Sequence, residues 1–110
     1  MAAVGILLFA LIIGFARVSA AQDTTAAGQT VYTAQKCALC HSIAGKGNGK
    51  GPLDDVGTKL PADDIRAWIV DAKGMTAKKK APRKPEMKAY SLPKADVDAL
   101  VAYLSSLKKS

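Results

Sequence analysis

The chain has 110 residues, of which 16 are Lys or Arg and nine are Asp or Glu, and its formal net charge is +7. It contains two cysteines and one histidine. A chain of this length allows one small domain, and two cysteines exclude a scaffold held by several disulfides because they form at most one internal bridge.

The N-terminal residues 1–20 are similar to a secretory signal peptide, with a thirteen-residue apolar run from Val4 to Ala16 followed by small residues. No Lys or Arg precedes the run and Arg17 follows it, so an uncleaved membrane anchor is the alternative. The run is short for a bilayer span, which needs about 20 residues. We therefore expect cleavage near Ala20 or Ala21 and export to the periplasm, with a soluble mature domain over residues 21–110.

A first helix is predicted over residues 25–36, where it leads into the motif CALCH at residues 37–41. Without the leader, the domain keeps only four aromatic side chains, which are Tyr32, Trp68, Tyr90 and Tyr103. A domain of roughly 90 residues buries a modest share of its surface and usually needs a disulfide, a metal or a cofactor to complete its core.

The motif contains Cys37, Cys40 and His41, and several kinds of site have this composition. A thioredoxin-like thiol pair usually lies between a strand and a helix in a βαβ unit, and no such unit is predicted. A zinc site needs four ligands, whereas the chain offers three of the usual nitrogen and sulfur kind. A disulfide across two intervening residues would close a small loop and add little stability.

The pattern C-x-x-C-H is the signature of c-type haem attachment, in which two thiols add to the vinyl groups and the adjacent histidine binds the iron. One helical turn places both sulfurs at one edge of the macrocycle and the next side chain under its centre. Export of a chain with no other cysteine also favours this interpretation. We therefore predict one covalent haem c, attached at Cys37 and Cys40 with His41 as an iron ligand, whose apolar plate completes the core.

Beyond the motif, residues 45–57 contain five glycines and no core-facing pattern, which predicts an irregular loop. Residues 60–74 predict a helix with Pro61 in its first turn and Gly74 at its end. Its apolar stripe consists of Ile65, Trp68, Ile69 and Ala72.

Residues 75–92 are rich in Lys and Pro and are predicted to form a loop. The last helix is predicted to start near Pro93, and its apolar residues at helical spacing are Val97, Leu100, Val101, Leu104 and Leu107. No alternating strand pattern of useful length occurs, so an all-α fold is expected.

Because His41 is the single histidine, a second iron ligand must be a methionine or a lysine, or be absent. Met1 lies in the leader, which leaves Met75 and Met87. Met75 follows the predicted helix end at Gly74 and is expected to fill the core. Met87 lies in the proline-flanked stretch K-P-E-M-K-A-Y-S-L-P, which can hold its thioether facing His41 across the haem plane. We predict Met87 as the second ligand.

The first helix carries Gly28 and Tyr32, and the last helix carries Leu100 and Tyr103. With the haem motif, these residues make the mature part of the chain resemble the small monohaem cytochromes c with His/Met ligation. The resemblance implies a cytochrome c-like fold of three to four helices with long irregular loops around one haem. It also implies that Gly28 lets the two helices cross closely, with both tyrosines beside the contact.

Two loops extend the resemblance. The sequence G-P-L at residues 51–53 is similar to the family's loop after the haem motif, which implies that the Pro52 carbonyl accepts a hydrogen bond from His41 and sets its tautomer. The pattern M-x-x-Y, formed by Met87 and Tyr90, is the usual form of the family's methionine loop.

The interval from Tyr32 to Cys37 is one residue longer than in many members of the family. We therefore expect the first helix to bulge or end differently near Gln35 and Lys36. A tryptophan in some relatives donates its indole hydrogen to a haem propionate, and Trp68 is a candidate for the same role; the alternative is a core position on the middle helix.

An iron held by imidazole and thioether has no vacant position for a substrate. The predicted function is therefore a soluble electron carrier in which haem c cycles between Fe(III) and Fe(II), and not an enzyme. The alternative is a haem c protein whose sixth site is open because Met87 does not reach the iron, acting as a small-ligand sensor or a peroxidase. The chain has no second histidine as an acid–base group, which weakens the enzymatic version.

Seven basic residues surround Met87 within residues 73–88, where Glu86 is the one acidic residue; this basic cluster consists of Lys73, Lys78, Lys79, Lys80, Arg83, Lys84 and Lys88. We expect it to orient the haem edge toward acidic redox partners by an attraction that salt screens. The alternative is a solvated loop kept for solubility. An exported haem protein has little occasion to bind nucleic acid, and we expect a monomer.

Overall fold

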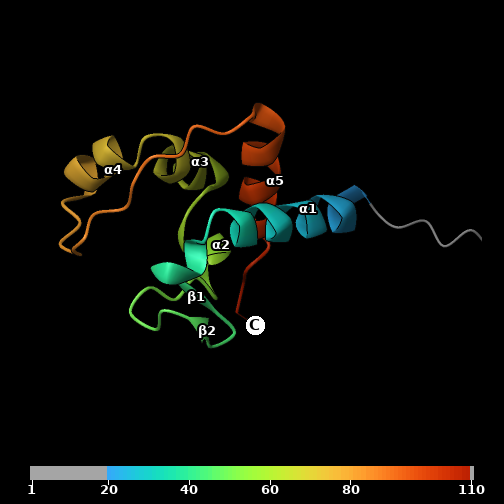
Figure 1. Cartoon of the computed structure of the whole chain (residues 1–110), viewed down its shortest axis with the longest axis horizontal. Helices are drawn as coiled ribbons and strands as arrows, with labels where there is room; N and C mark the ends of the chain where they lie inside the picture. Colours follow the sequence, from blue (N-terminus) through green and yellow to red (C-terminus); the bar gives the residue numbers. More distant parts are fainter. Residues whose placement is uncertain (1–19, 110) are drawn as a thin grey trace, which may run out of the picture.

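The computed structural model describes residues 20–109, and its framework is a pair of crossing helices, α1 (Ala20–Ala34) and α5 (Lys94–Ser105) (Figure 1). The elements between them are the 3-10 helix η1 (Cys37–Leu39), strands β1 (Ser42–Ile43) and β2 (Lys46–Gly47), and helices α2 (Val56–Lys59), α3 (Ala62–Val70) and α4 (Ala72–Lys79). Helices dominate the described residues, so the predicted all-α fold is confirmed.

The predicted leader, residues 1–20, lies outside the described part of the chain except for its last residue. Within residues 20–109, no helix has both the length and the apolar character needed to cross a bilayer.

Helix α1 begins at Ala20, earlier than the predicted start near Thr25, and ends at Ala34. The backbone then turns tightly, because Lys36 adopts a left-handed conformation with φ of 57° and its N–H donates to the Thr33 carbonyl at 3.1 Å. This turn accommodates the additional residue before the motif, and the expected change in the helix end near Lys36 is confirmed.

The crossing of α1 and α5 depends on a glycine. Gly28 is buried, and a Cβ atom at this position would collide with the carbonyl oxygen of Ala99 and with Cβ of Tyr103. Beside the contact, the rings of Tyr32 and Tyr103 meet edge to face with their centroids 6.0 Å apart. The close approach implied by the resemblance to cytochromes c is therefore confirmed.

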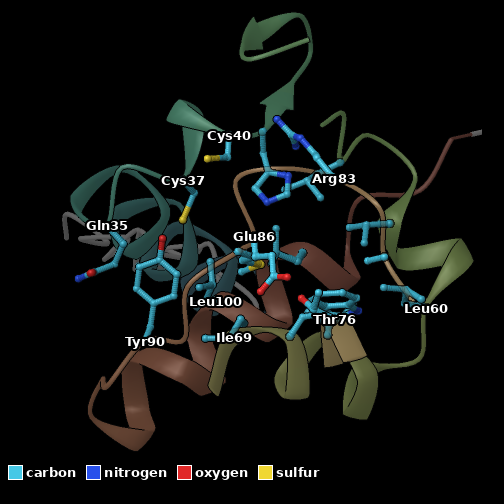
Figure 2. Close-up of a pocket in the computed structure, with 18 of the residues that line it drawn as sticks. Gln35, Cys37, Cys40, Leu60, Ile69, Thr76, Arg83, Glu86, Tyr90 and Leu100 are labelled. Carbon is cyan, nitrogen blue, oxygen red and sulfur yellow. The ribbon is translucent and has the colours of Figure 1, made fainter. Parts of the chain in front are cut away.

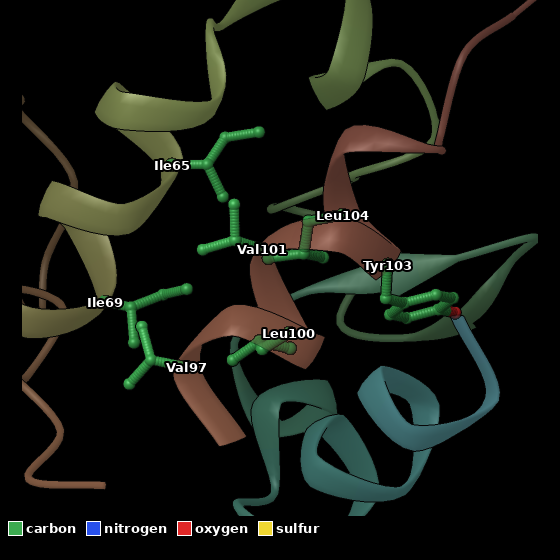
Figure 3. Close-up of a cluster of buried hydrophobic side chains, with 7 residues drawn as sticks. All are labelled: Ile65, Ile69, Val97, Leu100, Val101, Tyr103 and Leu104. Carbon is green, nitrogen blue, oxygen red and sulfur yellow. The ribbon is translucent and has the colours of Figure 1, made fainter. Parts of the chain in front are cut away.

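The core forms where α3 packs on α5 (Figure 3). Its buried members are Ile65 and Ile69 from α3 and Val97, Leu100, Val101, Tyr103 and Leu104 from α5. Helix α5 begins at Lys94, directly after Pro93, as the helical spacing predicted. Burial of each large aliphatic side chain contributes about 1.5–3 kcal/mol, so this interface orients α3 on the framework.

The predicted single helix over residues 60–74 is wrong, because the structure has two helices there. Helix α3 ends at Val70, and Asp71 has non-helical dihedral angles before α4 begins at Ala72. The Asp71 carboxylate caps α4 by accepting a hydrogen bond from the backbone N–H of Gly74 at 3.3 Å. Gly74 therefore lies in the first turn of α4 and does not end a helix.

The predicted loop over residues 75–92 is correspondingly shorter, since α4 continues to Lys79. Helix α4 is rich in lysine and lacks a strong apolar stripe, so the apolar periodicity of the sequence did not predict it. It is nevertheless anchored by three buried residues, which are Ala72, Met75 and Thr76.

The glycine-rich segment is largely irregular but not without structure. Strands β1 and β2 form a minimal antiparallel hairpin in which Ser42 faces Gly47 and Ile43 faces Lys46. Helix α2 was not predicted. It is held against the end of α5, where the Gly57 N–H donates to the Leu107 carbonyl at 2.9 Å.

Candidate functional site

A cavity of about 520 Å³ lies between the cysteine motif, α3, α5 and the loop after α4 (Figure 2). This volume is within the range of roughly 300–1,000 Å³ that is usual for sites of small molecules and cofactors. Most of its wall is apolar, including Leu53, Val56, Leu60, Ile65, Ile69 and Leu100. The core of the domain is therefore open on one side toward a space of cofactor size.

Both cysteines line this cavity from one rim, with Leu60 and Thr76 on the far side in Figure 2. The left-handed residue Lys36 starts the turn of η1, and the N–H groups of Cys40 and His41 both donate to the Cys37 carbonyl, at 3.1 and 3.0 Å. This single turn brings the two sulfurs and the imidazole to the same cavity. Burial raises the pKa of the Cys37 thiol.

Both cysteines are free thiols, so the disulfide alternative has no support in the structure. Among residues 20–109, no group of three or more His, Cys, Asp or Glu side chains is arranged to hold a metal ion. The geometry of the described residues therefore gives no support to a zinc site either.

The His41 ring is oriented by a hydrogen bond from its Nδ1 to the backbone carbonyl of Gly51 at 3.0 Å. Because a carbonyl only accepts, Nδ1 carries the proton and Nε2 keeps its lone pair for a metal. Burial lowers the pKa of His41, the Gly51 hydrogen bond opposes this shift, and the nearby Arg83 guanidinium lowers the pKa further. The imidazole is therefore held neutral and in one tautomer.

The expected acceptor for this hydrogen bond was the carbonyl of Pro52, and the structure corrects that assignment by one residue. Pro52 is exposed and forms an isolated parallel bridge with Ser42 instead. The Ser42 N–H donates to the Gly51 carbonyl at 3.0 Å and the Leu53 N–H donates to the Ser42 carbonyl at 2.8 Å. This bridge turns the Gly51 carbonyl toward His41, while Pro52 faces solvent.

The two candidate methionines occupy different places. Met87 is half-buried and lines the cavity from the loop after α4. Met75 is 5% exposed, lies within α4 and is not part of the cavity wall. Of the two thioethers, that of Met87 is the one placed to reach a group in the cavity.

Trp68 and Tyr90 also line the cavity, and both are half-buried. The Tyr90 N–H donates to the Ile69 carbonyl at 2.8 Å, which ties the end of the Met87 loop to α3. Burial raises the pKa of the Tyr90 hydroxyl. The proposed bond from the Trp68 indole to a propionate stays a prediction.

Several polar residues of the cavity wall were not assigned to it from the sequence. Thr76 is buried and enters from α4, and recognition of α4 as a helix would have been needed to place it. Arg83 was visible only as part of the basic cluster, yet its guanidinium lies against Gly51. Gln35, Lys79 and Glu86 are further polar residues of the wall.

Tyr32, identified in the sequence by its packing role, reaches the cavity as well. Its hydroxyl is buried and has no hydrogen-bond partner among the described residues. Burial, reinforced by the neighbouring Cys37, raises the pKa of Tyr32 to about 12.

The donor set fits a covalently attached haem. Two free thiols share one rim, a neutral imidazole presents Nε2, and a thioether comes from a separate loop. These are the groups that c-type attachment and His/Met ligation need. The apolar wall suits the faces of a porphyrin, and Thr76, Lys79 and Arg83 are the polar side chains that would be available to its carboxylates.

The sequence model of the Cytochrome c family matches residues 25–108. Cytochrome c oxidase subunit 2 of Alkalihalophilus pseudofirmus is 30% identical to this chain over 90 residues, which covers 74% of this chain and 25% of that protein. The chain therefore corresponds to about a quarter of that relative's length. No solved structure gives a significant match.

Proposed function

Because this chain belongs to the cytochrome c family, we propose that it is a one-electron carrier with one covalent haem c, in which the iron cycles between Fe(III) and Fe(II). Cytochromes c are haem-binding electron-transfer proteins and in general not enzymes. The relative is by name a subunit of cytochrome c oxidase, and this supports a role in respiratory electron transfer.

The main support for the proposal is that His41 and Met87, which belong to separate elements, line the same apolar cavity. His41 belongs to the turn that also carries both cysteines, whereas Met87 lies beyond α4, more than forty residues later in the chain. A site closed from two sides by the protein's own side chains suits electron exchange better than substrate turnover.

When bound, haem c supplies the one-electron chemistry. The thiols of Cys37 and Cys40 would attach it, and the Gly51 carbonyl would keep the His41 ring in the orientation that presents Nε2. Met87 would be the second protein ligand of the iron, and its thioether would raise the reduction potential and leave no position for a substrate. The apolar wall excludes water, which favours the less charged ferrous form.

Replacement of the two methionines tests this arrangement. Met87→Ala should abolish the long-wavelength methionine-to-iron absorption band of the ferric protein and lower the midpoint potential. Met75→Ala is the matched control and should keep the band, because Met75 lies in the core outside the cavity wall. Persistence of the band in Met87→Ala, or avid carbon monoxide binding by the unmodified ferrous protein, would refute the proposed ligation.

The basic cluster supports encounter with acidic redox partners. Lys78, Lys80 and Lys88 are exposed, while Lys84 pairs with Glu86 at 2.8 Å. Surface charges of this kind steer association and lose their effect as salt is added. Stopped-flow electron transfer to an acidic redox protein should therefore slow strongly between low and high ionic strength. A rate that does not depend on salt would remove the steering role.

We also propose export to the periplasm after removal of the leader, which leaves residues 21–110 as the mature domain. Covalent haem attachment suits an exported chain, and the leader resembles a signal peptide. Mass spectrometry of the purified protein gives both the processed terminus and the added mass of the porphyrin. A retained leader would instead favour the membrane-anchor alternative.

A further inference from the structure

Two side chains of the loop after α4 turn inward. Among residues 82–89, only Arg83 and Met87 are half-buried, whereas the other six residues are exposed. Both inward side chains line the cavity. Arg83 differs in this respect from the other six members of the basic cluster, all of which are exposed. Its guanidinium is therefore placed to act inside the molecule and not at the surface.

The Arg83 guanidinium reaches the segment that orients His41. A Cβ atom at Gly51 would collide with Nη1 of Arg83 and with the carbonyl oxygen of Cys40. The same Cβ would lie 3.0 Å from Nδ1 of His41. Gly51 does not have a positive φ angle, so its backbone conformation does not require glycine. The missing side chain instead provides the space in which Arg83 meets the cysteine motif, on the Cys40 side of the cavity (Figure 2).

No carboxylate explains this position of Arg83. Within residues 20–109, the structure has no salt bridge to its guanidinium. The acidic residue of the same loop, Glu86, pairs with Lys84 at 2.8 Å. A guanidinium carries several N–H donors and a permanent charge, so its burial is costly unless acceptors lie nearby. The acceptors near Arg83 are backbone carbonyl groups.

Of the carbonyl groups of Cys40 and Gly51, that of Cys40 has the capacity to accept. The Gly51 carbonyl already accepts hydrogen bonds from Nδ1 of His41 and from the Ser42 N–H, both at 3.0 Å, and these use its two lone pairs. By contrast, no backbone N–H of residues 20–109 donates to the Cys40 carbonyl. The contact of Arg83 with Cys40 therefore joins the loop after α4 directly to the residue that precedes His41.

We propose that Arg83 is a positioning residue that fastens the loop after α4 to the cysteine motif and so keeps Met87 at the cavity. The inference rests on the proposed ligation by Met87 and identifies what holds that ligand in place. Residues 82–89 have no backbone–backbone hydrogen bond to restrain them, so the Arg83 contact carries a large share of the restraint. A contact between a charged donor and a carbonyl is stronger than one between neutral groups, and its loss should increase the open population of the loop about tenfold.

Imidazole binding to the ferric haem-loaded protein measures this opening. At about pH 8, imidazole is mainly neutral, and it binds the iron only while Met87 is away from it. Its apparent affinity is therefore proportional to the open fraction. The variants are Arg83→Gln, the conservative Arg83→Lys and the control Lys50→Gln. Lys50 is an exposed lysine next to Gly51, so its replacement removes the same charge without removing the contact.

Cleavage by an endoproteinase specific for lysine measures the same opening without the iron. The peptide bond after Lys88 lies between Met87 and Tyr90 and is present in every variant. A protease must draw several residues around this bond into its active site, so the initial rate of cleavage follows the open population of the loop. Mass spectrometry of the fragments gives this rate for the haem-loaded protein.

Arg83→Gln should bind imidazole about tenfold more tightly than the unmodified protein and should be cleaved after Lys88 about tenfold faster. Arg83→Lys should lie between these two proteins, because an ammonium keeps the charge but lacks the planar fork of the guanidinium. Lys50→Gln should behave like the unmodified protein in both measurements.

Equal rates of cleavage for Arg83→Gln and the unmodified protein would overturn the proposal, as would equal effects of Arg83→Gln and Lys50→Gln. The two proposals fail separately, because cleavage does not depend on an iron ligand. If Met87 does not bind the iron, the unmodified ferric protein lacks the methionine-to-iron band and all proteins bind imidazole alike, while cleavage still judges the role of Arg83. A normal band with unchanged imidazole affinity and cleavage in Arg83→Gln would contradict the role of Arg83 alone.

Discussion

The crossing of α1 and α5 and the loop that carries Met87 both contribute to the wall of the cavity, but different interactions hold them in place. At the crossing, Gly28 is buried with its Cα against the Ala99 carbonyl and Tyr103, and the Tyr32 ring packs on Tyr103. The contact leaves no space for another heavy atom. Its stability comes from packing within the protein.

The Met87 loop has much less support. Residues 82–89 form no backbone–backbone hydrogen bond with any described residue. The segment is fixed at its ends, where the Ala81 N–H donates to the Thr76 carbonyl at 3.1 Å and the Tyr90 N–H donates to the Ile69 carbonyl at 2.8 Å. Between these two points, the conformation of the loop is held by side-chain contacts, and the side chain of Met87 lies in the cavity wall.

The difference separates the tasks of the two regions. The crossing holds the framework on which the cysteine motif is placed, and its packing consists of direct contacts between α1 and α5. The loop, by contrast, gains much of its order from whatever Met87 contacts, since segments with few internal bonds open at low free energy. The positions of the two thiols are therefore set by the framework of the fold, whereas the position of Met87 depends on what its side chain contacts.

The largest effect is expected where the crossing is broken. Gly28→Val would place side-chain atoms against the Ala99 carbonyl and Tyr103, and separation of the helices should cost about 3 kcal/mol or more of unfolding free energy. Denaturant unfolding of the haem-loaded protein measures this loss. Gly49→Ala is the matched control, because no atom lies within 4 Å of a Cβ at that position. Equal stability of Gly28→Val and Gly49→Ala would contradict the importance of the crossing.

A smaller effect is expected from release of the loop. Met87→Ala should lower the free energy of unfolding by about 1–2 kcal/mol, because the replaced side chain is only half-buried. Hydrogen–deuterium exchange should accelerate at residues 82–89 and remain slow in α1 and α5. The comparison of regions would be wrong if exchange rose to the same degree in the two helices.

Tyr32 belongs both to the crossing, where its ring contacts Tyr103, and to the cavity wall. Replacement of its hydroxyl group therefore tests whether water reaches the protein between the crossing and the cavity. Tyr32→Phe removes a buried hydroxyl without a partner among the described residues, so stability at neutral pH should be unchanged or rise by up to about 1 kcal/mol. The larger difference is expected in alkali. The pKa of Tyr32 rises from 10.0 to about 12 on folding, so the unfolded state loses its proton first.

The unmodified protein should therefore lose stability as the pH rises from 10 toward 12, and Tyr32→Phe should lose less over the same range. Thermal unfolding at stepped pH values measures both curves. Parallel curves for the two proteins would show that the Tyr32 hydroxyl is solvated in the folded state, and that the boundary is open to water.

The smallest effect is expected at a surface contact between α3 and α5. Asp98 accepts hydrogen bonds from Arg66 at 2.6 Å and from Lys94 at 2.8 Å, and these bonds lower the pKa of its carboxyl group below 3.8. Their contribution to stability is complete above pH 3.8 and is lost as the pH falls through the lowered pKa. Asp98→Asn should cost little at neutral pH, and should flatten the acid side of the stability curve. If Asp98→Asn leaves the loss of stability in acid unchanged, the two hydrogen bonds to Asp98 contribute nothing to stability.

The sequence alone was sufficient for the features that depend on local spacing. The pattern C-x-x-C-H predicts covalent attachment of haem c because its five consecutive residues include both thiols and the adjacent histidine. The apolar stripe from Val97 to Leu104 identified α5. The single histidine excluded a second histidine ligand and left a methionine, a lysine or no ligand, and of the two candidate methionines the structure brings Met87 to the cavity. The pairing of Gly28 with Tyr103 was also anticipated, through the resemblance to cytochromes c.

Tertiary structure alone decided the features that depend on contacts distant in sequence. Asp71 separates α3 from α4 because its carboxylate caps α4. The apolar periodicity of the sequence does not predict this cap. The acceptor for His41 is the carbonyl of Gly51, since the bridge between Ser42 and Pro52 sets which peptide faces the ring. Spacing along the chain determines which groups a turn can present together, whereas the direction of a carbonyl or a loop is set by the elements packed around it.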